Sequence, residues 1–196
     1  ESTTLFFIPS FVNTKVERDV QKIITSIQKQ GDKALLKCIE SFDKIKVNNI
    51  NKIKISKNEI SKSYSLVSKT EISNLKKAIV RIRKFSKMQL SSSWSYEEHG
   101  SLLGEKVTAI ESVGLYVPGG KASYPSTVLM NAIPAKVAGV KRVIMCSPID
   151  EIDQHALAIV AADLCEVDEI YKMGGAHAIA ALAYGTNTIK PVNKIF

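Results

Sequence analysis

Two glycine pairs stand where the backbone could approach a ligand, Gly119-Gly120 and Gly174-Gly175. The first pair follows a β-rich run that ends at Tyr116, and the second follows the apolar run at 169–173. Glycine lets the backbone pass close to a bound group, and the free amides at the start of a following helix favour an anion such as a pyrophosphate. Neither pair completes the G-x-G-x-x-G motif, so a glycine pair alone is better explained by a tight strand-to-helix turn than by a nucleotide site.

Polar side chains beside the first glycine pair strengthen the case for a ligand. Tyr116 offers a flat ring and a hydroxyl, and further hydroxyls follow at Ser123, Tyr124, Ser126 and Thr127. Each hydroxyl can both donate and accept hydrogen bonds. This neighbourhood favours a binding loop after the strand that ends at Tyr116.

The histidines and the clustered carboxylates differ in what they suggest. His177 follows the second glycine pair closely, so its side chain can reach a ligand there or cap the helix. His99 and His155 have no second histidine three or four residues away, as a zinc site on one helix would need, and we interpret both as exposed polar residues. The acidic group Asp163, Glu166, Asp168 and Glu169 is interpreted as solvated surface.

The first half of the chain is predicted to be mainly helical, and we place this region at residues 1–100. Apolar residues recur there at helical spacing, and Gly31 suits the end of one helix. Asp32 can cap the next helix. Capping-box spacing occurs at Thr14 and Glu17 and again at Ser56 and Glu59. The Ser-rich stretch at 91–101 lacks apolar periodicity and is predicted to be a connection.

The second region, residues 101–196, alternates strand and helix patterns. The expected strands end near residues 116, 147 and 173, helical patterns follow each of them, and the last four residues open another strand. Such alternation is typical of βαβ units in a parallel, doubly wound sheet. We therefore predict an α/β fold in which a helical amino-terminal region is followed by an incomplete Rossmann-like domain.

The net charge of +8 is unevenly distributed. Residues 101–196 contain 8 Lys+Arg and 9 Asp+Glu, whereas residues 1–100 contain 19 and 10. Nearly all of the basic residues are lysines interleaved with Ile, Asn and Ser, whereas nucleic-acid readers tend to use arginine for bidentate contacts. We expect no nucleic-acid partner, and a lysine-rich nucleic-acid binder remains a minor alternative.

Composition also limits the compartment. No apolar run approaches the roughly 18 residues that a membrane span needs, and the opening segment lacks the basic start of a secretion signal. The three cysteines, Cys38, Cys146 and Cys165, show no C-x-x-C spacing and are predicted to be reduced thiols. These features predict a cytoplasmic protein with no membrane partner.

Three long blocks of the sequence resemble the histidinol dehydrogenase family. They are LYVPGG with ASYPSTVLMNAIPAKVAG, the block at 167–186 that contains GGAHAIAALAYG, and GDKALLKCIESFD at 31–43. The resemblance implies an NAD-dependent, zinc-containing oxidoreductase that converts L-histidinol to L-histidine through the aldehyde with two NAD. This is the last step of histidine biosynthesis, and the family acts as a homodimer.

The resemblance also implies two cofactor-binding residues. The tyrosine of LYVPGG is an NAD contact in the family and corresponds to Tyr116. A second contact is the glutamine of the family's G-G-A-Q-A-I-A-A, which is His177 here. Imidazole presents its donor and acceptor with a different geometry from an amide, so a hydrogen bond to NAD could survive in altered form or be lost at a cost of about 1 kcal/mol. The other interpretation is that His177 caps the helix.

The resemblance places the family's zinc ligands and its Glu-His acid–base pair downstream of the matched blocks. We therefore expect no catalytic residue and no metal ligand in this chain, and no turnover from this segment alone. The alternative is a noncatalytic remnant or partner-binding module with the same fold.

Overall fold

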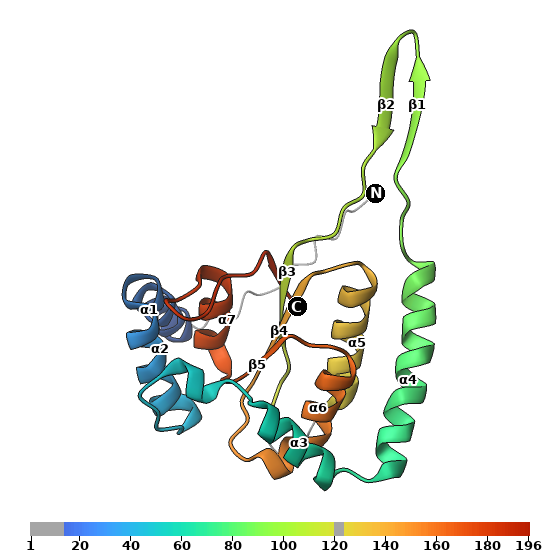
Figure 1. The fold of residues 1–196 in the computed structure, drawn as a ribbon. Coiled ribbons are helices and arrows are strands. Elements are labelled where there is room, and N and C mark those ends of the chain that lie inside the picture. The colour runs from blue at the N-terminus through green and yellow to red at the C-terminus, as the bar shows by residue number, and fades with distance from the viewer. Residues whose placement is uncertain (1–13, 120–123) are drawn as a thin grey trace, which may run out of the picture.

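The computed structural model describes residues 14–119 and 124–196, and it shows an α/β fold built on a four-stranded parallel sheet (Figure 1). The strand order is β5-β4-β3-β6, and every neighbouring pair is parallel. The strands are β3 (Ser112–Tyr116), β4 (Arg142–Ser147), β5 (Glu169–Lys172) and β6 (Lys194–Ile195). The predicted fold class is confirmed.

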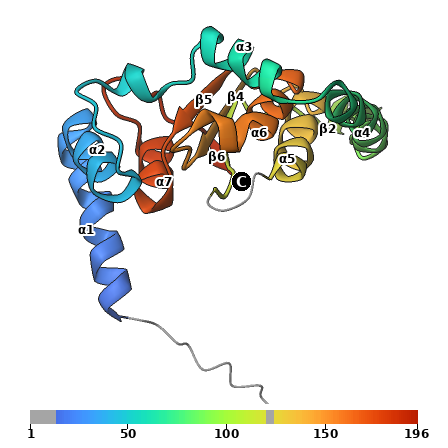
Figure 2. The same ribbon diagram turned by 90° about the horizontal axis from the view of Figure 1, so that it is seen from below.

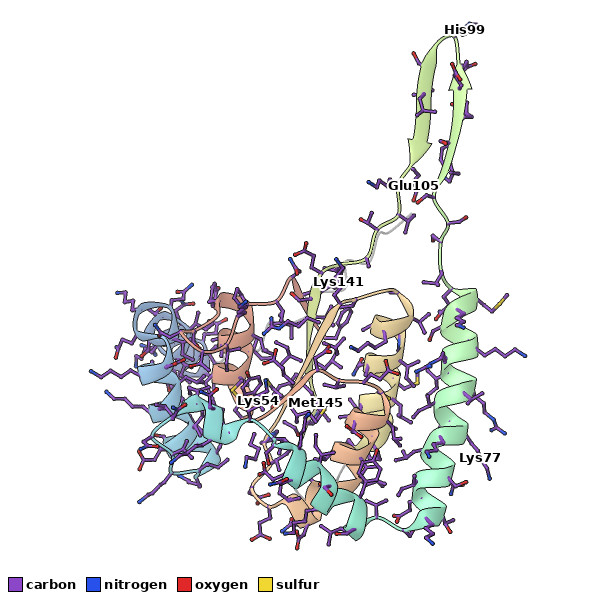
Figure 3. All side chains as sticks on the ribbon, viewed as in Figure 1. Lys54, Lys77, His99, Glu105, Lys141 and Met145 are labelled. Atoms are coloured by element: carbon purple, nitrogen blue, oxygen red, sulfur yellow. The ribbon has the colours of Figure 1, made fainter. Side chains whose placement is uncertain are left out.

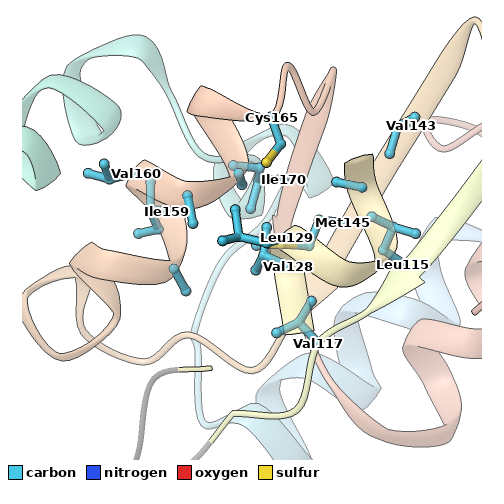
Figure 4. Packing of buried hydrophobic residues seen from close by; sticks show 14 of the residues in the cluster. Leu115, Val117, Val128, Leu129, Val143, Met145, Ile159, Val160, Cys165 and Ile170 are labelled. Atoms are coloured by element: carbon cyan, nitrogen blue, oxygen red, sulfur yellow. The ribbon is translucent and has the colours of Figure 1, made fainter. Parts of the chain in front are cut away.

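The sheet has an apolar side chain on each face because its strands are apolar at consecutive positions. Val113 and Leu115 face one core, whereas Gly114 and Tyr116 face the other. A sheet buried on both faces is what near-continuous apolar runs predict for parallel strands. Figure 4 shows the first core, in which Leu115, Val143 and Met145 of the sheet meet Leu129 and Ile159 of the helices.

Helices cover both faces of the sheet in layers (Figures 1 and 2). One face carries α5 (Pro125–Val137) and α6 (Ile152–Leu164), and α3 (Lys57–Leu66) and α4 (Lys69–Met88) pack outside them. The other face carries α7 (Gly175–Tyr184), against which α1 (Thr14–Gln30) and α2 (Asp32–Cys38) pack. Two short turns, η1 (Ile39–Asp43) and η2 (Ile50–Ile53), complete this layer.

The direction in which the chain winds along the sheet reverses at β3. From β3 through β5 the chain moves outward along the sheet with α5 and α6 on one face, and then α7 returns it on the other face to β6. Helices on opposite faces of one sheet define a doubly wound arrangement. Loops at the carboxyl ends of the strands therefore gather at one edge of the sheet.

The start of α2 differs from the prediction. Gly31 separates α1 from α2 with φ of 53°, as predicted for a helix stop, but the Asp32 side chain does not cap α2. Its carboxylate instead accepts hydrogen bonds from Thr188 N at 3.2 Å and Thr188 Oγ1 at 2.6 Å. This long-range contact replaces the helix cap because the loop that contains Thr188 lies against the turn at Gly31. It ties the first helices to the segment before β6.

The segment predicted to be a connection at 91–101 forms a hairpin, so that prediction was wrong. Strands β1 (Trp94–Glu98) and β2 (Ser101–Glu105) pair antiparallel, and they project from the body with His99 at the tip (Figures 1 and 3). His99 and Gly100 both have positive φ, as a two-residue hairpin turn of type I′ requires. The signal was weak because the alternation at Trp94 and Tyr96 is too short to mark a strand, and every residue of both strands is exposed.

The cysteines pack within the fold. All three cysteines are free thiols, with Cys146 and Cys165 buried and Cys38 half-buried. Burial raises the pKa of each thiol, to about 12 for Cys165, so these are inert packing residues. No helix in the described part of the chain is long and apolar enough to cross a membrane.

The capping role of Ser56 at the start of α3 can be tested by substitution. The Ser56 hydroxyl accepts from Glu59 N, and the Glu59 carboxylate accepts from Ser56 N, as the spacing predicted. We expect Ser56→Ala to lower the free energy of unfolding by about 1 kcal/mol because an N-terminal amide loses its acceptor. Urea unfolding followed by circular dichroism measures the change.

Ser65→Ala is the matched control, since this serine lies exposed in the same helix. We expect it to change the free energy of unfolding by no more than about 0.5 kcal/mol. Equal effects of the two substitutions would contradict a capping role for Ser56.

Candidate functional site

Three loops meet at the carboxyl edge of the sheet, and Pro148 packs between two of them. A Cβ added at Gly119 would lie 2.6 Å from both Cγ and the carbonyl oxygen of Pro148, and one added at Gly174 would lie 2.8 Å from Pro148 Cβ. Glycine is therefore needed at both positions for close approach of the backbone. The loops after β3, β4 and β5 are held as one surface. Gly120 and Ser123 lie outside the described residues.

Tyr116 links the first of these loops to the third. Its ring packs against the core on the α7 side, and its hydroxyl accepts a hydrogen bond from Gly175 N at 3.1 Å. The tyrosine hydroxyl keeps its own hydrogen for a second partner. The Tyr116 side chain thus connects the end of β3 to the start of α7, and its hydroxyl hydrogen can still be donated.

Asp43 supplies the other acceptor at the start of α7. Its Oδ1 accepts from Gly174 N at 3.1 Å, and its Oδ2 lies 2.7 Å from Nε2 of His177. The side chains of Asp43 and His177 are only 6% and 2% exposed. A carboxylate at a helix amino terminus interacts favourably with the helix dipole. The amides of Gly174 and Gly175 at the start of α7 are therefore bonded by Asp43 and Tyr116.

His177 is held from two sides. Besides Asp43, the ring of Phe42 stacks on the imidazole with centroids 5.7 Å apart and an interplanar angle of 20°. A carboxylate facing Nε2 requires a hydrogen on that nitrogen, so in the neutral ring Nδ1 is the acceptor. His177 does not cap α7, because Asp43 and Tyr116 bond the helix amides. Its predicted contact with NAD stays a prediction.

The remaining histidines divide between the surface and the core. His99 is exposed at the hairpin tip, as predicted. His155 is 2% exposed and lies 3.3 Å from Asp150 Oδ1 through Nε2, so its interpretation as an exposed residue was wrong. It is buried because α6 is covered by the sheet on one side and by α3 on the other. The described residues contain no group of three or more His, Cys, Asp and Glu that could hold a metal ion.

A hollow of about 380 Å³ opens beside these loops, and we call it the β4 pocket. It is lined by Phe42, Asp43, Gly119, Pro148, Ile149, Asp150 and Gln154. The Phe42 side chain is 59% exposed, whereas His177, on which its ring stacks, is buried. The hydrogen bond from the Glu151 amide, helped by His155, holds the pKa of Asp150 below its usual range. The pocket therefore combines an aromatic ring with an ionised carboxylate.

The opposite edge of the sheet carries a charge cluster that has a structural role. Glu169, at the start of β5, was predicted to be solvated surface, but its carboxylate accepts from Arg142 Nε at 2.9 Å and from Tyr171 OH at 2.7 Å. Lys54 pairs with it at 3.1 Å. Burial opposes ionisation, yet the hydrogen bonds from Tyr171, Arg142 and Lys54 keep the pKa of Glu169 below its usual range. The cluster joins β4, β5 and the segment after η2.

Comparison with known proteins agrees with these features. Residues 9–196 match a family model described as histidinol dehydrogenase. The chain belongs to the histidinol dehydrogenase family. It is 45% identical to a histidinol dehydrogenase of Nitrosomonas europaea and 46% identical to one of Carboxydothermus hydrogenoformans, over 94% of this chain in both cases.

A solved structure of the family has the same fold. The crystal structure of histidinol dehydrogenase from Elizabethkingia anophelis superposes with a TM-score of 0.85 at 34% identity and covers 92% of this chain. The chain spans 42% of that structure and 43% of the length of the two curated relatives above. The match therefore concerns less than half of a typical family member.

The partnership of Asp43 and His177 was not predicted from the sequence. The structure brings Tyr116, Gly174 and His177 together, as expected from their places after adjacent strands, but Asp43 comes from a turn 134 residues away from His177. The only signal was that Asp43 ends the GDKALLKCIESFD block. Phe42 lies in the same block, and its ring covers His177 and lines the β4 pocket.

Removal of the Asp43 carboxylate tests how strongly this edge depends on it. We expect Asp43→Ala to lower the free energy of unfolding by about 1–3 kcal/mol for each buried donor left unpaired, namely Gly174 N–H and the His177 ring N–H. Asp43→Asn keeps an oxygen for Gly174 N–H, so its loss should be smaller. Urea unfolding measures both variants.

Glu40→Ala is the control, because Glu40 lies exposed in the same turn η1. Its effect should stay within about 0.5 kcal/mol. If Asp43→Ala were no more destabilising than Glu40→Ala, the buried pair would not hold the start of α7.

Proposed function

We propose that this chain is the NAD-binding part of a histidinol dehydrogenase, and that the whole protein oxidises L-histidinol to L-histidine through the aldehyde with two NAD. This reaction is the last step of histidine biosynthesis. The observation that carries the proposal is the surface at the carboxyl edge of the sheet, where Tyr116 and the two glycines packed on Pro148 meet. Ligands of open parallel sheets bind at this edge.

The residues at this edge suit a dinucleotide. The close approach of Gly119 and Gly174 to Pro148 joins the loops after β3, β4 and β5 into one surface, and the β4 pocket of about 380 Å³ adjoins it. Pockets for small molecules usually measure roughly 300–1,000 Å³. NAD, when bound, supplies the hydride acceptor that oxidation of an alcohol needs. Tyr116 would orient it by donating its hydroxyl hydrogen.

Zinc and the acid–base groups belong to the part of the proposed enzyme outside this chain. Zinc sites in enzymes use three protein ligands around an open position. Within residues 14–119 and 124–196 no such group of side chains converges. As the resemblance to the family implies, we assign the metal ligands and the proton transfers to the longer protein, and we propose that this chain positions the cofactor.

We further propose that the whole protein is a cytoplasmic homodimer. The β1-β2 hairpin supports association, because an isolated two-stranded hairpin is only marginally stable in water. Its large apolar side chains, Trp94, Tyr96, Leu102 and Leu103, are all between 45% and 76% exposed. The unpaired thiols are consistent with a reducing compartment.

A second candidate is a noncatalytic module that retains the fold. The observation that favours it is His177, which replaces a family glutamine and is turned toward Asp43. Such a module would bind no NAD, so binding to the 196-residue chain separates the two candidates.

Turnover is tested by NADH formation at 340 nm with L-histidinol, NAD and zinc. We expect no activity from the 196-residue chain, and activity from a longer protein in which the family's downstream motifs follow Phe196. Zinc ligands and a base are required for the chemistry and are supplied only by that longer chain. Turnover by the 196-residue chain would contradict the division of roles, and an inert longer protein would contradict the proposed reaction.

Cofactor binding is tested separately by titration calorimetry of NAD into the 196-residue chain. We expect Tyr116→Phe to weaken NAD binding about fivefold, because one hydrogen bond worth about 1 kcal/mol is lost. Tyr184→Phe is the matched control, since Tyr184 is 53% exposed at the far end of α7. Equal NAD affinity of the two variants would remove Tyr116 from the site.

A further inference from the structure

Helix α4 forms one outer side of the molecule, and its exposed face is basic. It packs on α5 with its buried residues, such as Leu75 and Ile79. Its sequence contains seven basic residues and one glutamate. Lys77, Arg81 and Lys84 recur at helical spacing on the side opposite the buried residues, and Figure 3 shows Lys77 on the side away from the sheet. Within the described residues none of these three has an ion-pair partner.

Large apolar side chains lie among these charges. Val80 and Met88 are 68% and 82% exposed. Both fall on the side of Lys84, because helical residues four positions apart are neighbours. Exposed apolar surface with a polar surround is typical of an interaction site. We call this surface the outer face of α4, made of Lys77, Val80, Arg81, Lys84 and Met88, and it fits a partner that is both acidic and apolar.

The β1-β2 hairpin has this complementary chemistry. Its charged residues are all acidic, namely Glu97, Glu98 and Glu105. The rings of Trp94 and Tyr96 stack with centroids 6.2 Å apart and an interplanar angle of 11°. Leu103 lies directly opposite Tyr96 in the register, so it shares the face of the two rings. The hairpin therefore presents an aromatic face and a negative charge.

Within one chain the hairpin does not cover α4, because the two lie end to end (Figures 1 and 2). A two-fold axis through the joining segment would place each hairpin antiparallel along the α4 of a second copy. The five residues of each strand span about 17 Å, and the 20 residues of α4 span about 30 Å. Each hairpin would thus cover the carboxyl-terminal half of α4, where the outer face lies.

An apolar groove of about 540 Å³ opens at the base of the hairpin, where two such copies would cross. It is lined by α5 and by the segments on both sides of the hairpin, with Met130, Leu90 and Val107 among its residues. A right-handed connection continuing outward from β6 would place its helix on the α7 face of the sheet. Such a unit would leave this groove, on the α5 face, open to a second copy.

From this complementarity we propose that two copies of the chain associate by exchanging hairpins, so that the hairpin of each copy lies on the outer face of α4 of the other. The aromatic face packs on Val80 and Met88, and the glutamates face Lys77, Arg81 and Lys84. This inference rests on the proposed homodimer and names its two contacting surfaces. It involves no residue of the proposed cofactor site.

The test is the mass of the 196-residue chain in solution, measured by light scattering after size exclusion. We expect a dimer at low salt that dissociates as sodium chloride is raised, because salt screens exposed charges. Glu97→Lys with Glu98→Lys, and separately Arg81→Glu with Lys84→Glu, should each raise the dissociation constant of the dimer about tenfold or more, because attraction becomes repulsion. Circular dichroism checks that each variant is folded.

An equimolar mixture of the two variants distinguishes contacts between copies from contacts within one chain. In a mixed dimer the new lysines of one hairpin meet the new glutamates of the other copy's α4, and the second contact keeps its original charges. We therefore expect the mixture to form dimers again. Lys29→Glu with Lys33→Glu is the matched control, since it changes the net charge equally at exposed positions of α1 and α2 and should leave the dimer unchanged.

Two results would overturn the hairpin exchange. If the reversed hairpin and the reversed α4 weaken the dimer no more than the control does, the two surfaces are wrong and the proposed homodimer stands. If the 196-residue chain is a monomer at low salt, the exchange is also wrong, and the mass of the longer protein then decides the proposed homodimer. NAD binding is measured separately and is unaffected by either result.

Discussion

The arrangement of the carboxyl edge depends on one buried carboxylate. Asp43 accepts from Gly174 N and faces His177, so a turn of the helical first region holds the start of α7 in the second region. Both groups are almost fully buried, and a buried charge is stable only when it is paired and hydrogen-bonded. Tyr116 then completes the start of α7 through Gly175. Asp43 thus joins the first region to a loop that Tyr116 and Pro148 connect to the other two loops.

The packing of the first helices explains how Asp43 reaches this place. Ile27 of α1 and Leu35 of α2 are fully buried in the same core as Ala178 and Leu182 of α7. The chain then turns through η1, and Lys44 directly after it adopts a left-handed conformation with φ of 61°. The proposed domain division at residue 100 stays a prediction. Each of the two cores nevertheless combines side chains from both halves of the sequence, as Leu75 and Val113 do in the first core.

Patterns that are local in the sequence were predicted, and contacts between distant segments were not. The apolar runs at β3 and β4 and the capping box at Ser56 follow from periodicity and from the spacing of a few residues. The predictions that failed concern residues whose surroundings come from distant parts of the sequence. Asp32 bonds Thr188, and the helix α6 that carries the buried His155 is covered by α3, and neither contact can be inferred from the residues beside them. The β1-β2 hairpin was missed because its strands contact no core that would impose an apolar alternation.

The candidate site shows the same division more sharply. Tyr116 and the two glycine-containing loops could be placed from the rule that parallel strands end at one edge, and the resemblance to the family named the same residues. The pairing of Asp43 with His177 required the fold. It also changes what the second glycine pair can do. The amides of Gly174 and Gly175 already bond a carboxylate and a hydroxyl, so a diphosphate there would displace Tyr116 and meet the charge of Asp43. The second glycine pair is thus held by side chains of the fold itself, and the start of α7 fixes Tyr116 and His177 relative to each other.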